Sequence, residues 1–205
     1  MNKQVSKVHY DFQTYVQRFR WISYWHQIDE TLRVHPENVL LIGAGDQVVR
    51  KVLEEYIPSV QVLDIDKDLN PDFVCSVTEC TQVVKHQFDC VLCCQVLEHL
   101  PFEQFELCIK NISDLTVKDC IISLPCKRWT FGGAVTFFNK TFSWRRVVRR
   151  WGVRWNFNGE HYWEIGTKGT SEADIRSVLT KYFRIKRRFY ASGSTYHCFY
   201  ILEKR

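Results

Sequence analysis

The sequence predicts an α/β fold with three layers, α-β-α, around a sheet of about seven strands, the last of them antiparallel. Short apolar runs alternate with amphipathic stretches from residue 38 to residue 124, which is typical of a parallel sheet with helices on both faces. The first run breaks on a Gly-x-Gly turn and the second ends on a carboxylate. Two further strand-like runs, 183–191 and 196–203, close the chain as a hairpin.

The elements are expected in the following order. Residues 1–37 form an N-terminal helical cap, whose aromatic residues at roughly helical spacing we interpret as core rather than as a cofactor box: Tyr15, Phe19, Trp21, Tyr24 and Trp25. The alternating part consists of strand 38–43, helix 46–56, strand 60–65, short strand 73–77, strand 88–95, helix 102–115 and strand 119–124. A helix over 171–182 follows, with Ser171 as its N-cap and Asp174 at the third helical position.

Composition favours one domain, 1–205, with a sizeable core. The chain has 205 residues, of which 45% are hydrophobic and 15% aromatic, and this argues against disorder. It has no apolar run near the ~18 residues of a membrane span, and its N-terminus lacks a signal-peptide core. Nine cysteines, several inside a predicted strand, are expected to be free in a reducing, cytoplasmic setting. Cys90 and Cys93 spell C-x-x-C, but on a strand they point to opposite faces and cannot grip one metal ion.

The glycine turn is the first chemical signal. Val39 to Ile42 form an apolar run that breaks on Gly43-Ala44-Gly45, where a backbone without side chains can lie flat against a ligand. About 20 residues later Asp64 ends the next apolar run, at the spacing where an acid meets ribose hydroxyls in nucleotide-binding units. The pair predicts an adenosine-containing cofactor.

A second motif identifies the cofactor. The segment Phe88-Asp89-Cys90-Val91-Leu92-Cys93-Cys94-Gln95-Val96-Leu97-Glu98-His99-Leu100 resembles the "FDvV…vLEHl" pattern of class I (Rossmann-like) S-adenosylmethionine (SAM) methyltransferases. Ile121-Ile122-Ser123-Leu124-Pro125 resembles their fifth strand. The resemblance runs from about Asn38 to Pro125, and more loosely through Glu160 to Gly166. It implies an enzyme that transfers a methyl group from SAM to oxygen or nitrogen of an acceptor.

The resemblance also implies roles for particular residues. Cofactor-binding candidates lie at the turn and at the strand ends: Gly43, Ala44, Gly45, Asp64, Ile65, Ser76, Val77 and Gln95. Among them, Asp64 is expected to accept hydrogen bonds from both ribose hydroxyls, and Ile65 and Val77 to sandwich the adenine. Catalytic candidates on the acceptor side are His99, His161, Tyr162 and Glu164.

Three positions depart from the family pattern. Leu41 stands where an acid is usual, Gln47 where a third glycine is frequent, and Ser76 near the place of an adenine-side carboxylate. These departures motivate a second hypothesis, a catalytically silent methyltransferase-like binding module.

The stretch from Gln95 to His99 also resembles the E-x-x-E-H motif of metal-assisted O-methyltransferases. Its first acid is replaced by Gln95, a much poorer ligand, so no metal is predicted. The alternative is a divalent ion held by Glu98 and His99 together with His161.

A basic and aromatic insertion or lid is expected over 126–170. Between Cys126 and Gly159 there are eight basic residues and no acid, whereas the rest of the chain has 20 basic and 23 acidic residues. Trp144, Val147, Val148 and Trp151 recur at i, i+3, i+4 and i+7, which predicts an amphipathic basic helix over 144–154. We expect its apolar stripe to lid the acceptor pocket, with its arginines on the rim.

Two other uses of the insertion stay open. It can lie on an anionic membrane surface, or it can steer an anionic substrate or nucleic acid into the pocket. The acceptor is therefore expected to be a small molecule, with an anionic one as an alternative. An RNA methyltransferase is the third functional hypothesis. The sequence does not predict the oligomeric state.

Overall fold

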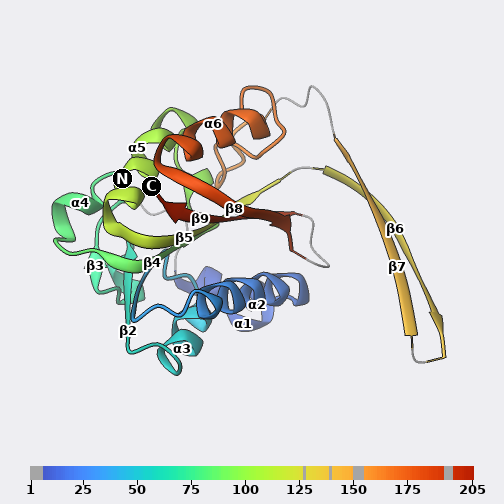
Figure 1. The fold of residues 1–205 in the computed structure, drawn as a ribbon, viewed down its shortest axis with the longest axis horizontal. Helices are drawn as coiled ribbons and strands as arrows, with labels where there is room; N and C mark the ends of the chain where they lie inside the picture. Colours follow the sequence, from blue (N-terminus) through green and yellow to red (C-terminus); the bar gives the residue numbers. More distant parts are fainter. Residues whose placement is uncertain (1–6, 127, 139, 150–154, 192–195) are drawn as a thin grey trace.

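A seven-stranded sheet forms the centre of the computed structural model, which describes residues 7–126, 128–138, 140–149, 155–191 and 196–205 (Figure 1). Its strand order is β3-β2-β1-β4-β5-β9-β8, and β9 runs antiparallel to both of its neighbours. The strands are β1 (Asn38–Ile42), β2 (Ser59–Asp64), β3 (Phe73–Val74), β4 (Phe88–Cys94), β5 (Thr116–Pro125), β8 (Phe183–Tyr190) and β9 (His197–Lys204). The predicted fold is confirmed, including the antiparallel last strand.

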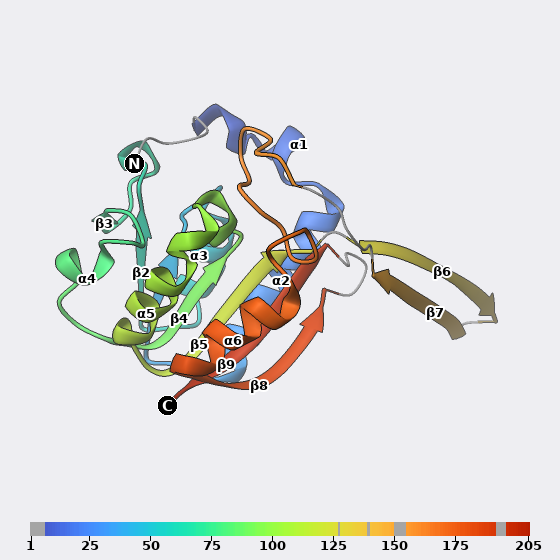
Figure 2. The same cartoon turned by 90° about the horizontal axis from the view of Figure 1, so that it is seen from above.

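Helices cover both faces of this sheet, as Figures 1 and 2 show. On one face lie α2 (Arg18–Arg33) and α3 (Val48–Glu54), and on the other lie α4 (Cys80–Val83), α5 (Phe105–Leu115) and α6 (Glu172–Tyr182). The short helices are η1 (Lys7–Tyr10), α1 (Phe12–Tyr15), η2 (Lys67–Leu69), η3 (Leu97–His99) and η4 (Phe102–Gln104). The result is the expected α-β-α arrangement.

Two hydrophobic cores follow from the alternation of side chains along the strands. In β1, Leu40 and Ile42 belong to the core under α4, α5 and α6, whereas Val39 and Leu41 belong to the core under α2 and α3. Cys90 and Cys93 of β4 divide in the same way, and all nine cysteines are free. The prediction that Cys90 and Cys93 point to opposite faces of the strand is confirmed.

The N-terminal cap is helical, but its aromatic stripe does not form the core as expected. Tyr24 is buried, whereas Phe19, Trp21 and Trp25 are at least half exposed. The face of α2 that meets the sheet is largely polar, because its buried groups find partners there: Thr31 donates to a backbone carbonyl of the helix, and Glu30 pairs with Arg187 of β8. The interpretation as core is therefore wrong for these three aromatic residues.

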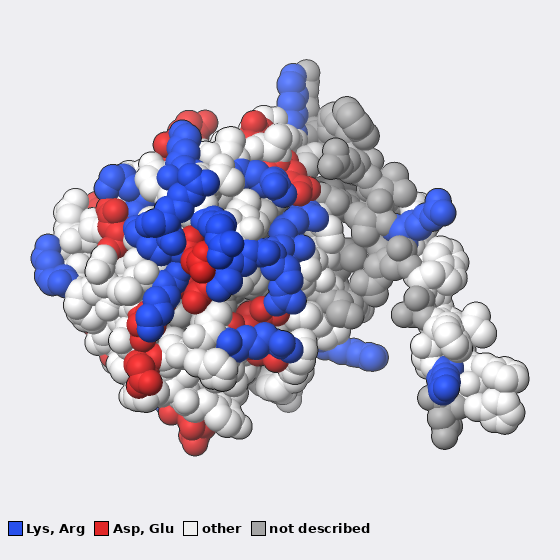
Figure 3. Space-filling view, viewed as in Figure 1, with Lys and Arg blue, Asp and Glu red and all other residues white. Residues whose placement is uncertain are grey.

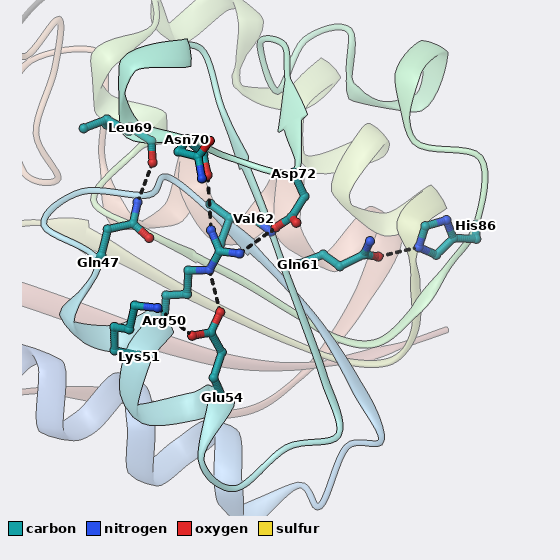
Figure 4. A network of polar contacts seen from close by, with 10 residues as sticks. All are labelled: Gln47, Arg50, Lys51, Glu54, Gln61, Val62, Leu69, Asn70, Asp72 and His86. Carbon is teal, nitrogen blue, oxygen red and sulfur yellow. Dashed lines mark hydrogen bonds and ion pairs between the residues drawn. The ribbon is translucent and has the colours of Figure 1, made fainter.

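A polar network ties α3 to the segment after β2 (Figure 4). Arg50 forms ion pairs with Glu54 at 2.7 Å and with Asp72 at 3.2 Å. Gln47, whose φ is 67°, donates its side-chain amide to the carbonyl of Leu69 at 2.9 Å. A left-handed glutamine explains how this chain dispenses with the third glycine of the family pattern, and the hydrogen bond fixes the loop that carries Leu69.

The C-terminal elements agree closely with the prediction. Ser171 caps α6 and, together with Asp174, forms a reciprocal capping box. β8 and β9 then form the expected terminal hairpin. The predicted turn at 192–194 lies outside the described residues.

The predicted basic helix is wrong. β6 (Arg128–Phe137) and β7 (Lys140–Arg149) form a separate two-stranded antiparallel sheet, which extends away from the body (Figures 1 and 2). Aromatic and β-branched residues favour strands, and the two strands pair over a ten-residue register from Arg128↔Arg149 to Phe137↔Lys140. The helical spacing also relied on Trp151, which lies outside the described residues.

The predicted lid is contradicted at Trp144. Trp144 is 61% exposed, so it does not pack over a pocket. The side chains of Val147 and Val148 lie outside those that the structure describes. Further along, Trp163 is buried and donates its indole N–H to the carbonyl of Leu100 at 2.9 Å, so residues near it, unlike the hairpin, pack against the body.

Candidate cofactor and acceptor site

A cavity that is open at its mouth lies at the carboxyl ends of β1 to β4. Because the sheet order is β3-β2-β1-β4, the ends of these strands stand in a row, and the strand order reverses between β1 and β4. Such a switch point is where open α/β sheets bind ligands. Of the eight predicted cofactor residues, seven line it: Gly43, Gly45, Asp64, Ile65, Ser76, Val77 and Gln95.

The glycine turn forms part of the cavity wall. Gly43 has a φ of 91°, and a Cβ on it would stand 2.6 Å from Cγ2 of Val96. Gly45 has a φ of 51° and has open space where its Cβ would be. Both are left-handed positions that favour glycine. The bare backbone at Gly45 thus leaves room that a ligand can fill.

Asp64 is held by the turn that it faces. Its Oδ2 accepts the backbone N–H of Ala44 at 2.7 Å, and its Oδ1 accepts the N–H of Asp66 at 2.8 Å. Burial raises the pKa of Asp64, and these two hydrogen bonds oppose that rise. Each oxygen retains a second lone pair for a hydroxyl. Ala44 itself is buried, and its contribution is this N–H rather than a place on the lining.

The residues predicted to lie near the adenine are held in place from α5. Asn111 donates its side-chain amide to the carbonyls of Val77 at 3.1 Å and Thr78 at 2.9 Å. Ser76 accepts a hydrogen bond from the Thr78 hydroxyl at 2.8 Å. Val77 is buried and Ile65 is partly exposed at the rim, so two apolar side chains from neighbouring strand ends face the same cavity.

Two tyrosines that the sequence analysis did not assign to the site complete the wall. Tyr10 and Tyr15 line the cavity, and their rings meet edge to face at 4.9 Å. Arg20 lies over the Tyr15 ring at 3.7 Å and donates to the Tyr15 carbonyl at 3.0 Å. The stripe interpretation placed Tyr15 in the core. Their position in the same cavity as the glycine turn, about 30 residues further along the chain, could not be predicted from a sequence motif.

The end of β4 supplies the other side of the cavity. Gln95 has a φ of 58° and donates its side-chain amide to Oγ of Ser123 in β5 at 3.1 Å. His99 also lines the cavity, and its Nδ1 donates to the carbonyl of Glu160 at 2.9 Å, because a carbonyl can only accept. Burial lowers the pKa of His99, and the nearby His161 lowers it further. This imidazole is therefore neutral at neutral pH.

Behind His99 lies a buried acid–base network. The rings of His99 and His161 are 4.9 Å apart. Oε1 of Glu164 accepts from His161 at 3.3 Å and from the Tyr196 hydroxyl at 2.5 Å. Burial lowers the pKa of His161, but the hydrogen bond to Glu164 and the surrounding carboxylates raise it more, so its net pKa lies above the ordinary value. Burial and the hydrogen bond to Glu164 raise the pKa of Tyr196, which keeps its proton.

Glu98 is the most unusual member of this network. It is fully buried, and among the described residues neither of its carboxylate oxygens has a hydrogen-bond partner. Burial raises its pKa to about 7, although the charge of His161 opposes the rise. Ligand atoms of Glu98, His99 and His161 all lie within 4.8 Å of one another. One carboxylate and two imidazoles fit a divalent ion as well as they fit a shared proton.

Tyr162 is separate from the other catalytic candidates. Its backbone N–H donates to the carbonyl of Glu98 at 2.8 Å, which connects the two segments. Its ring, however, is 40% exposed and packs against Phe157 with centroids 4.5 Å apart. The structure therefore brings together His99, His161 and Glu164, adds Glu98 and Tyr196, and leaves the ring of Tyr162 at the surface.

Comparison with solved structures connects this architecture to known proteins. The N-methyltransferase NodS from Bradyrhizobium japonicum WM9, solved in complex with S-adenosyl-L-homocysteine, is 11% identical over 92% of this chain and 88% of its own, with a TM-score of 0.63. Magnesium protoporphyrin IX methyltransferase (ChlM) from Synechocystis PCC 6803, with bound SAM, is 18% identical over 100% and 87%, with a TM-score of 0.57. The methyltransferase domain of bacterial CtHen1-CN is 15% identical over 91% and 100%, with a TM-score of 0.60.

No family model matches the sequence, and no curated protein matches it. The chain has the class I SAM-dependent methyltransferase fold. Within the described ranges, every helix is too short or too polar to cross a lipid bilayer.

Proposed function

We propose that this protein is a SAM-dependent methyltransferase. The observation that carries the proposal is the convergence of Gly43, Gly45 and Asp64 on one cavity at the switch point of the sheet. The cavity fits the cofactor: it offers open backbone at Gly45, a carboxylate with unused lone pairs, and apolar side chains at Ile65 and Val77. When bound there, SAM supplies a methyl group on a positively charged sulfur.

The protein's own residues position and deprotonate the acceptor. His99 lines the cavity as a neutral imidazole and is suited to take a proton from an acceptor hydroxyl or amine. His161, held by Glu164, supports the His99 ring from behind. Gln95 stands where a metal-binding family has an acid, and its amide is engaged with Ser123, so we propose a mechanism that depends on alignment and proton transfer without a metal ion.

Transfer of label from methyl-labelled SAM tests this proposal. The protein is incubated with a small-molecule extract and, separately, with total RNA. We expect label in the small-molecule fraction with wild-type protein and none with Asp64→Ala, while Asp114→Ala, an exposed acid on α5, behaves as wild type. Label in RNA alone would favour an RNA methyltransferase. SAM binding without transfer to either fraction would favour the silent binding module.

A further inference from the structure

The hairpin of β6 and β7 stands apart from the rest of the molecule. Its strands pair with each other and belong to a sheet of their own, which extends away from the α-β-α body (Figures 1 and 2). A two-stranded hairpin is marginally stable in water unless something covers an apolar face. The composition of its two faces therefore indicates what it contacts.

One face of the hairpin carries its exposed aromatic side chains. The register places Val135 opposite Phe142 and Gly133 opposite Trp144, and the Trp144 indole lies over Gly133, where an added Cβ would stand 3.2 Å from Nε1. The large apolar side chains of this face are each more than half exposed: Phe131, Val135, Phe137, Phe142 and Trp144. Arg146 and Lys140 lie on the same face, opposite Phe131 and Phe137. Phe138 at the turn is 86% exposed and extends this surface to the tip.

The opposite face is polar or small. Thr136 and Thr141 lie opposite each other and their hydroxyls are 3.0 Å apart. Gly132 and Ala134 precede Thr136 at alternate positions on the same face. The hairpin is thus amphipathic, with a period of two rather than the helical period.

Charge is distributed unevenly along the hairpin. From residue 129 to residue 144, Lys140 is the one charged residue of the sequence. The other seven basic residues of the segment flank this stretch: Lys127, Arg128, Arg145, Arg146, Arg149, Arg150 and Arg154. The charges of the segment are therefore all positive, with no acid between Cys126 and Gly159, and most of them lie in sequence before residue 129 or after residue 144.

The basic residues of β8 have acidic partners. They form ion pairs with the body: Arg184 with Glu203, Lys186 with Asp119, Arg187 with Glu30 and Arg188 with Glu172. Figure 3 shows red and blue atoms mixed over the body, and blue atoms without red on the coloured part of the hairpin. The counter-charge for the hairpin must come from outside its own segment.

We propose that the hairpin is a membrane-interface anchor that docks on an anionic lipid surface. Phe137, Phe138, Phe142 and Trp144 enter the boundary between headgroups and acyl chains, where aromatic side chains are favoured. Lys140 and Arg146, which lie on the same face, remain at the lipid phosphates. A second copy of this chain would instead bring two segments of the same positive charge together. A nucleic acid needs basic residues interleaved with the stacking rings, and the tip has one.

Vesicle co-sedimentation of the full chain without SAM tests this proposal independently of methyl transfer. We expect binding to phosphatidylcholine vesicles that contain phosphatidylserine, at least tenfold weaker binding to phosphatidylcholine alone, and release by high salt. Phe137→Ser combined with Phe138→Ser, and Lys140→Glu combined with Arg146→Glu, should each weaken binding at least tenfold. Tyr56→Ser and Lys85→Glu, two exposed residues of the body, are the matched controls and should bind as wild type.

A second measurement keeps the test decisive if a hairpin variant folds poorly. Vesicles with brominated acyl chains should quench part of the wild-type tryptophan fluorescence, and Trp144→Phe should lose that part. Equal binding to neutral and anionic vesicles, or no binding to either, would overturn the proposal. Two results without vesicles would also overturn it. One is salt-sensitive binding to RNA, and the other is self-association, if either is abolished by the Phe137→Ser and Phe138→Ser substitutions.

Discussion

Oδ2 of Asp64 accepts the backbone N–H of Ala44 at 2.7 Å, across 20 residues of sequence. This hydrogen bond connects the end of β2 to the glycine turn after β1, which are neighbours in the sheet. The acid is therefore oriented before any ligand arrives. An oriented acceptor loses less conformational entropy on binding a hydroxyl than a mobile one.

Replacement of Asp64 should consequently weaken cofactor binding. Asp64→Ala is expected to reduce the affinity for SAM by ~1.5–3 kcal/mol, as for hydrogen bonds to a charged group. Isothermal titration calorimetry measures this loss, and Asp114→Ala serves as a control with an intact site. Wild-type affinity in Asp64→Ala would show that this carboxylate does not contact the cofactor.

The two glycines of the turn should respond differently to alanine. Gly43→Ala is expected to lower the free energy of unfolding by ~2–4 kcal/mol, because the new Cβ would meet Val96 at 2.6 Å in a left-handed conformation. Gly45→Ala is expected to cost only ~1–2 kcal/mol, since its Cβ enters open space. Urea denaturation checks the order, and SAM titration should show that Gly45→Ala still impairs binding. Equal costs at the two positions would contradict the described turn.

Glu98 predicts how stability depends on pH. Burial raises its pKa in the folded protein from 4.5 to about 7, so the folded state holds this proton more tightly than the unfolded chain. The stabilisation of the folded state by this bound proton is complete below pH 4.5. As the pH rises to about 7, the free energy of unfolding falls by up to about 3 kcal/mol. Glu98→Gln, whose amide does not ionise, should lose less stability than wild type over this window. Denaturation curves at several pH values measure the difference, with the exposed Glu55→Gln as control. Parallel curves for wild type and Glu98→Gln would show that this carboxyl does not titrate with folding.

Chelation separates the two roles open to Glu98, His99 and His161. We expect methyl transfer to survive EDTA, because Gln95 replaces an acid of the metal-binding pattern and His161 is paired with Glu164. The measurement is the rate of S-adenosyl-L-homocysteine formation before and after chelation. Loss of turnover that magnesium, manganese or zinc restores would instead assign these three residues as metal ligands.

Much of the fold could be predicted because the strands of the sheet are short apolar runs bounded by turns. The boundaries of β1, β2 and β4 differ from the prediction by one residue at most. The hairpin of β6 and β7 was missed because Trp144, Val147 and Val148 fit a helical period by coincidence. The signal for a strand was the alternation of Phe131, Val135 and Phe137 with smaller residues, which the helical interpretation did not consider.

Some residues of the candidate site could likewise be predicted from the sequence, and others could not. Gly43, Gly45 and Asp64 are local signals at strand ends and could be placed from the sequence. Tyr15 and Tyr196 could not, because they reach the site through the N-terminal cap and through the terminal hairpin. Tyr196 meets Glu164 across 32 residues, and only the antiparallel position of β9 beside β5 brings them together.

Calorimetric titration of the wild-type protein with SAM and with S-adenosyl-L-homocysteine tests the central claim most directly. We predict saturable binding of both ligands at one site per chain, weakened in Asp64→Ala and unchanged in Asp114→Ala. The absence of any binding heat at high micromolar concentrations of either ligand, with a folded protein, would contradict the proposal that this cavity is a SAM site.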